Sequence, residues 1–224
     1  VGYDALTANT TGTQNVAVGA SALDANTTAN DNTGVGYNAL TSNTTGTQNV
    51  AVGTSALGTQ ADGGNYNTAV GTYALTDNTT GDSNTGIGRM ALFENTTGGS
   101  NTSVGMNSML DNTTGGSNTA VGESALANNT TASNNTAVGY NSLVANTTGA
   151  QNTAIGRQSL TANTTASYST AVGDEALLSN TTGAENTGMG QGALRTNTTG
   201  AYNVAMGTGS LRANTTASNN IGLG

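Results

Sequence analysis

The chain has no proline, cysteine, tryptophan or histidine, and only 4 of its 224 residues are Lys or Arg. Without histidine and cysteine it lacks the commonest general bases, thiol nucleophiles and soft metal ligands, so we expect no catalytic site, no cofactor and no metal site. The absence of cysteine also excludes a disulfide framework. The four arginines are scattered and the formal net charge is −8. Nucleic-acid binding needs clustered positive charge, so no nucleic-acid partner is expected.

Long apolar runs are also missing. No stretch approaches the roughly 18 apolar residues that would span a bilayer, so membrane insertion is not expected. Only 34% of residues are hydrophobic and 4% aromatic, which predicts a thin core. The sequence opens with Val1-Gly2 and has neither an initiator Met nor a signal peptide, so we expect a segment of a longer chain.

Thr (44), Gly (33) and Asn (32) are abundant instead, and they recur in strict register. An aliphatic residue followed by Gly returns every 17 residues from Val1-Gly2 to Leu223-Gly224, with one interval of 18. The array is continuous over 1–224. Its irregular unit lies at 49–66, where 58–64 replaces the Asn-Thr-Thr triplet found in the other twelve units. Such a period indicates a solenoid.

The unit reads N-T-A-V-G-x-x-A-L-x-x-N-T-T-G-x-x, and its positions are numbered from the first Asn, so that Asn152 is position 1 and Tyr168 position 17. Seventeen residues are too few for a helical hairpin, and β-branched residues with Gly and Asn are poor helix formers. The repeat therefore predicts an all-β, parallel β-solenoid of about 13 coils, one repeat per coil.

Alternation along Val16-Ala17-Val18 puts the two valines on one face, and we expect that face to point inward, with Ala17 outward. Leu at position 9 should form a second inward stack. The expected core stacks are Val18, Val35, Val52, Val70, Val121, Val138, Leu23, Leu40, Leu57, Leu75, Leu126 and Leu143.

Each residue of a solenoid lies above its counterpart in the next coil, roughly 4.8 Å away, so like stacks on like. Position 12 should then form amide ladders: Asn26, Asn43, Asn78, Asn95, Asn112, Asn129 and Asn146. Position 5 should supply turn glycines: Gly19, Gly36, Gly53, Gly71, Gly88 and Gly105. An invariant charge would repel its neighbours, and Asp and Glu accordingly occur only at variable positions, as solvated surface charge.

The units Asn135–Leu143 and Asn152–Gly156 resemble the repeats of bacteriophage tail-fibre proteins and of related bacterial surface proteins that end in an endosialidase-type chaperone domain. They are more loosely similar to the head repeats of trimeric autotransporter adhesins, whose unit is shorter. The resemblance implies a left-handed, often trimeric β-roll that serves as the shaft or receptor-facing surface of a fibre outside the cell or on a virion. It also implies a cell-surface glycan or protein receptor as partner.

A thin core favours burial of a further face against another copy of the chain, so a homo-oligomer, as a trimer or an end-to-end filament, is expected. Three alternatives concern other features. Asn-Thr-Thr fits the N-glycosylation pattern, although stacked glycans would be crowded. Exposed tyrosines at position 6, Tyr3, Tyr37 and Tyr140, could contact a partner. Rows of Thr and Asn could bind ice, although adjacent threonines of the triplet point to opposite sides.

Overall fold

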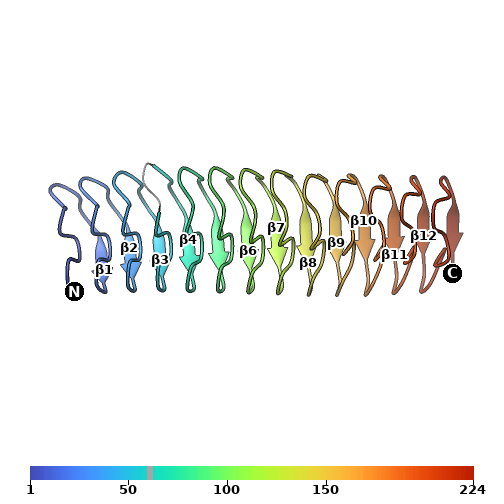
Figure 1. Ribbon diagram of the computed structural model, residues 1–224, viewed down its shortest axis with the longest axis horizontal. Helices are drawn as coiled ribbons and strands as arrows, with labels where there is room; N and C mark the ends of the chain where they lie inside the picture. The colour runs from blue at the N-terminus through green and yellow to red at the C-terminus, as the bar shows by residue number, and fades with distance from the viewer. Residues whose placement is uncertain (60–62) are drawn as a thin grey trace.

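The protein is a straight rod of stacked coils with its termini at opposite ends, as the computed structural model shows (Figure 1). The structure describes residues 1–59 and 63–224. It confirms the parallel β-solenoid: thirteen strands of three residues form one sheet in sequence order, each paired in parallel with the next. The strands are β1 Val16–Val18, β2 Thr33–Val35, β3 Val50–Val52, β4 Thr68–Val70, β5 Thr85–Ile87, β6 Thr102–Val104, β7 Thr119–Val121, β8 Thr136–Val138, β9 Thr153–Ile155, β10 Thr170–Val172, β11 Thr187–Met189, β12 Val204–Met206 and β13 Ile221–Leu223.

The register of the sheet follows the repeat without a slip. Ala120 of β7 pairs with Ala137 of β8, and Val121 with Val138, so equivalent positions stack. The irregular unit keeps this register, because Ala51 still pairs with Ala69. Gln60, Ala61 and Asp62 of this unit, within the 58–64 segment that replaces the triplet, lie outside the described residues. Thirteen strands at about 4.8 Å give a rod roughly 60 Å long.

The glycine row at position 5 turns the chain directly after each strand. At Gly122, φ is +135°, a conformation that L side chains rarely adopt, and an added Cβ would lie 2.6 Å from the carbonyl oxygen of Gly139. Both the backbone conformation and the neighbouring coil therefore require glycine at this position.

The leucine row at position 9 confirms the expected inward stack and adds a feature that the sequence did not predict. Leu23, Leu40, Leu57, Leu75, Leu126 and Leu143 are fully buried. Their backbone is left-handed, with φ of +55° at Leu126. A β-branched residue fits this conformation poorly, which explains why position 9 holds Leu or Met and never Val or Ile.

The structure contradicts the prediction that the strand valines form inward stacks. Ala137, at the centre of β8, is fully buried, whereas Thr136 and Val138 on either side are only partly covered. The same inversion holds for the other predicted core valines, which lie on the outer face of the sheet: Val18, Val35, Val52, Val70 and Val121.

The width of the coil explains this inversion. The Leu side chains of the opposite wall reach the strands, and a Cβ added at Gly86 of β5 would lie 3.2 Å from Cδ1 of Leu75. The inward strand position accordingly holds only Ala, Gly or Ser. Valine is excluded from the interior by its size, because the interior is already close-packed.

Candidate functional site: the outer face of the sheet

The asparagine row at position 12 is a buried structural ladder. Asn129 Nδ2 donates to Oδ1 of Asn112 at 2.7 Å and to the carbonyl oxygen of Ala132 at 3.0 Å. Its own Oδ1 accepts from Nδ2 of Asn146 at 3.0 Å. The same contact links neighbouring coils from Asn78 to Asn214, and from Asn9 through Asn26 to Asn43. These amides hold successive coils together.

This ladder also bears on N-glycosylation. A glycan is attached to the Asn side-chain nitrogen, and in Asn129 that nitrogen is buried with both protons donated within the protein. The folded chain therefore offers no acceptor at this site, even though the Asn-Thr-Thr pattern is present.

A second asparagine row, at position 1, braces the start of each strand. Asn135 donates its backbone N–H to Oδ1 of Asn118 at 2.9 Å, and its Nδ2 donates to the carbonyl oxygen of Gly149 at 3.0 Å. The contact to Gly149 crosses the coil and ties the strand to the corner at position 15. Both asparagine rows are thus committed to the interior.

The threonines of the triplet divide between two roles. Those at position 13 are tied to the neighbouring coil, because Thr96 Oγ1 donates to the carbonyl oxygen of Thr113 at 2.9 Å and Thr113 does the same to Thr130. Those at position 14, such as Thr114, are exposed on the corner. This corner is a single row of hydroxyls and does not form a flat surface.

The outer face of the sheet continues along the whole rod, and we call it the sheet face. It consists of positions 2 and 4 of all thirteen strands, with Thr or an aliphatic residue at position 2 and Val, Ile, Met or Leu at position 4. Its large side chains are half-exposed, for example Val121 at 37% and Ile155 at 40%. The Thr hydroxyls of this face have no hydrogen-bond partner within residues 1–59 and 63–224.

Charge is excluded from the sheet face. All 4 arginines and 11 of the 12 acidic residues of the sequence occupy positions 6, 7, 10, 11, 16 or 17, and the twelfth, Asp62, belongs to the irregular unit. One cluster on the edge is paired: Arg157 lies 2.8 Å from Asp174, and Arg195 lies 2.7 Å from Glu175. The hydrogen bond from Arg195 holds the pKa of Glu175 below its usual range. Partial burial raises the pKa of Asp77 and of Asp111.

Other expected features do not gather into a site. Tyr3, Tyr37 and Tyr140 are exposed at position 6, but they belong to coils that are not adjacent. In the part of the chain that the structure describes, no group of acidic side chains is placed to hold a metal ion. Nor do the described residues include a helix long and apolar enough to cross a bilayer.

The sequence prediction missed the sheet face because it assigned the two sides of each strand by the hydrophobicity of their side chains and did not consider their size. One signal was present: position 3 never holds a residue larger than Ser, whereas positions 2 and 4 vary among Thr, Val, Ile, Met and Leu. Restriction to small residues marks the inward position of a narrow coil. No family model, no curated protein and no solved structure matches the chain.

Proposed function

We propose that the chain is a structural segment of an extracellular fibre, non-enzymatic and assembled from several copies that meet through the sheet face. The observation that carries this proposal is the sheet face itself: a flat, uncharged, partly apolar strip that continues through all thirteen strands. The exposed corner at position 14 is a row of threonines, and the remaining exposed positions carry variable polar or charged residues.

The size of this strip supports association. Three residues per strand give a width of about 10 Å, which over roughly 60 Å of rod makes an area near 600 Å². That is at the upper end of the apolar patches on soluble monomers, and near the contribution of one partner to a stable interface, about 800 Å². Association would cover the methyl groups of Val and Thr, and the Thr hydroxyls could pair across the contact.

The remainder of the coil suits a shaft. The asparagine and threonine ladders connect successive coils along the whole rod, so tension or bending is distributed over many equivalent hydrogen bonds. The resemblance of the repeat to tail-fibre and adhesin repeats points in the same direction and implies a place on a virion or cell surface, with a glycan or protein receptor as partner.

Ice binding is a second candidate, and one observation favours it. Nine of the thirteen strands place a Thr hydroxyl outward at position 2, next to a methyl-bearing residue at position 4, in a regular flat array. The surface in question is then the sheet face and not the Asn-Thr-Thr corner, whose position 13 hydroxyls are used within the protein.

Two measurements on the purified chain separate these functions. Association through the sheet face predicts a mass above 21.9 kDa in sedimentation velocity and elongated particles in electron micrographs. Ice binding predicts a monomer that shows thermal hysteresis. The double variant Val104→Lys with Val121→Lys should return the assembly to monomers, because it places like charges in the strip; Thr114→Lys with Thr131→Lys, on the exposed corner, is the matched control.

If the wild-type chain is a monomer without hysteresis, both proposals for the sheet face fail. If the corner variant dissociates the assembly and the strand variant does not, the copies meet through another surface.

A further inference from the structure

Three consecutive coils place Tyr168, Glu185 and Tyr202 at the same corner of the rod. All three stand at position 17, two residues before the strand, and are followed by Ser169, Asn186 and Asn203. Their backbones are nearly identical, with φ of +62°, +57° and +57°. Each N–H donates to a carbonyl of the preceding coil, at 3.1 to 3.2 Å. The side chains therefore leave the coil from equivalent points, one above the other.

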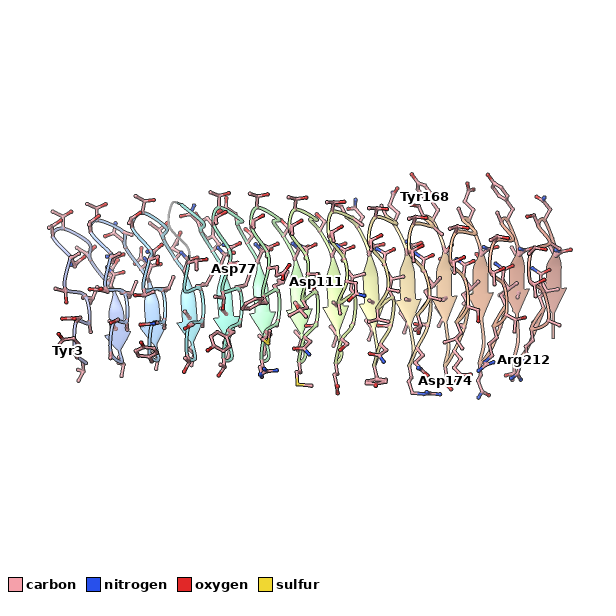
Figure 2. The ribbon with its side chains drawn as sticks, in the orientation of Figure 1. Tyr3, Asp77, Asp111, Tyr168, Asp174 and Arg212 are labelled. Carbon is pink, nitrogen blue, oxygen red and sulfur yellow. The ribbon has the colours of Figure 1, made fainter. Side chains whose placement is uncertain are left out.

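This repetition sets the spacing between the two aromatic rings. Two coils separate Tyr168 from Tyr202, so their anchor points lie about 9.6 Å apart, with Glu185 halfway between them. Tyr168 is 60% exposed and Tyr202 55%. A hollow of about 400 Å³ lies against Tyr168 and Glu185. Figure 2 shows Tyr168 standing out from the upper edge of the rod.

Within residues 1–59 and 63–224, the carboxylate between the rings has no cationic partner. The ion pairs found among the described residues join Arg157 and Arg195 to Asp174 and Glu175, at positions 6, 7 and 10. Figure 2 shows Asp174 at the lower edge of the rod, opposite Tyr168. Glu185 thus presents an uncompensated negative charge at the base of an aromatic pair, on a chain whose net charge is −8.

We propose that Tyr168, Glu185 and Tyr202 form a binding site for a quaternary ammonium group. A cation attracted to the face of an aromatic ring lies within about 6 Å of the ring centre. Rings that keep the roughly 9.6 Å spacing of their anchor points would each lie about 4.8 Å from a group held midway between them, inside that limit for both. Glu185 adds a direct charge interaction, and the methyl groups of the cation suit the ring faces.

Another tyrosine at the same position provides an internal comparison. Tyr66 is also exposed at position 17, with φ of +60°, but its neighbours along the row are Gln48 and Ser83, and no second tyrosine stands two coils away. It has the same backbone and exposure without the pair or the carboxylate. The site depends on the combination of three residues, so Tyr66 should not bind the cation. The proposal is independent of the sheet face, which lies on other positions of the coil.

Titration with choline, followed by NMR chemical shifts of the full chain, tests this site. Resonances of residues near 168, 185 and 202 should shift in the wild type. The uncharged isostere 3,3-dimethylbutan-1-ol should bind much more weakly. Tyr168→Ala, Tyr202→Ala and Glu185→Gln should each weaken choline binding roughly two- to fivefold, the range expected for one exposed cation–π or charge contact. Tyr66→Ala is the matched control and should bind as the wild type does.

The outcomes separate clearly. The proposal is overturned if choline causes no shifts, if the uncharged isostere binds equally well, or if Tyr66→Ala weakens binding as much as Tyr168→Ala. Cosedimentation with phosphatidylcholine vesicles then identifies the source of the group. Vesicle binding that free choline competes away indicates a lipid headgroup, whereas choline binding without vesicle binding indicates a small soluble cation.

Discussion

The inward and outward sides of the same three-residue strands obey different rules. In β8, Ala137 points inward and is fully buried, while Thr136 and Val138 point outward. Across the thirteen strands the inward position accepts only Ala, Gly or Ser, whereas the outward positions accept Thr, Val, Ile, Met and Leu. In a coil this narrow, the volume of a side chain decides which side of the strand it occupies, and its hydrophobicity comes second.

The largest expected effect comes from placing the same charge on the two sides of one strand. Ala137→Asp buries an unpaired carboxylate and should cost more than about 3 kcal/mol in free energy of unfolding. Val138→Asp leaves its carboxylate at the surface and should cost about 1 kcal/mol or less. Thermal unfolding followed by circular dichroism measures both. Equal losses would mean that the two sides have been assigned wrongly.

A smaller but still large loss in free energy of unfolding is expected when the asparagine ladder at position 12 is interrupted. Asn129→Asp removes the donor that bonds Asn112 and Ala132, and it puts a charge at a fully buried position. We expect a loss of about 3 kcal/mol. Asn128→Asp is the matched control, because its side chain is exposed one residue earlier in the sequence, and it should be close to neutral. Urea unfolding of the two variants provides the comparison, and similar midpoints would show that the ladder contributes little.

The glycines at position 5 and the glycines at position 15 should differ in how much stability they lose when replaced by alanine. At Gly139, φ is +133° and an added Cβ would lie 2.5 Å from the carbonyl oxygen of Gly156, so Gly139→Ala should cost about 2 kcal/mol. Gly149 is also close to the next coil, but its φ is not in the left-handed region, and Ala already occupies the equivalent places in both adjacent coils, Ala132 and Ala166. Gly149→Ala should therefore be mild. A larger drop in Tm for Gly149→Ala than for Gly139→Ala would contradict this reasoning.

The smallest expected effects concern acidic residues at the variable positions. Burial raises the pKa of Asp111, so its protonated form is favoured in the folded state. The resulting stability is present below the ordinary pKa of aspartate and is lost as pH rises through the raised value. Asp111→Asn should thus slightly raise Tm near pH 7 and flatten its dependence on pH over that window.

Glu175 serves as a control, because its pKa is shifted in the opposite direction to that of Asp111. Its pKa is lowered by Arg195, so its contribution to stability is present above the ordinary pKa of glutamate and is lost as pH falls through the lowered value. Glu175→Gln should slightly lower Tm near pH 7. If Asp111→Asn also lowers Tm at that pH, the carboxylate of Asp111 is stabilised by a contact that outweighs its partial burial.

The sequence was sufficient to predict the fold class, the period and the leucine stack, because a strict 17-residue repeat of β-branched residues, Gly and Asn fits few other architectures. It was not sufficient to orient the strand. Alternation places Val16 and Val18 together but does not say on which side, and that choice depends on the distance to the opposite wall, where Leu75 and its equivalents fill the interior. The repeat also did not predict the left-handed φ of Leu126, since leucine rarely adopts that conformation.

Association through the sheet face is tested most directly by disulfide cross-linking. The chain contains no cysteine, so an introduced cysteine is its only thiol. Thr119→Cys places one thiol outward on β7, the central strand, where two copies meeting along this face would bring their thiols together whether they run in the same or in opposite directions. Thr114→Cys, on the exposed corner of a neighbouring coil, is the control. Association through the sheet face predicts that mild oxidation converts Thr119→Cys to a covalent dimer and leaves Thr114→Cys monomeric. A monomeric Thr119→Cys variant, or equal cross-linking of both, would contradict it.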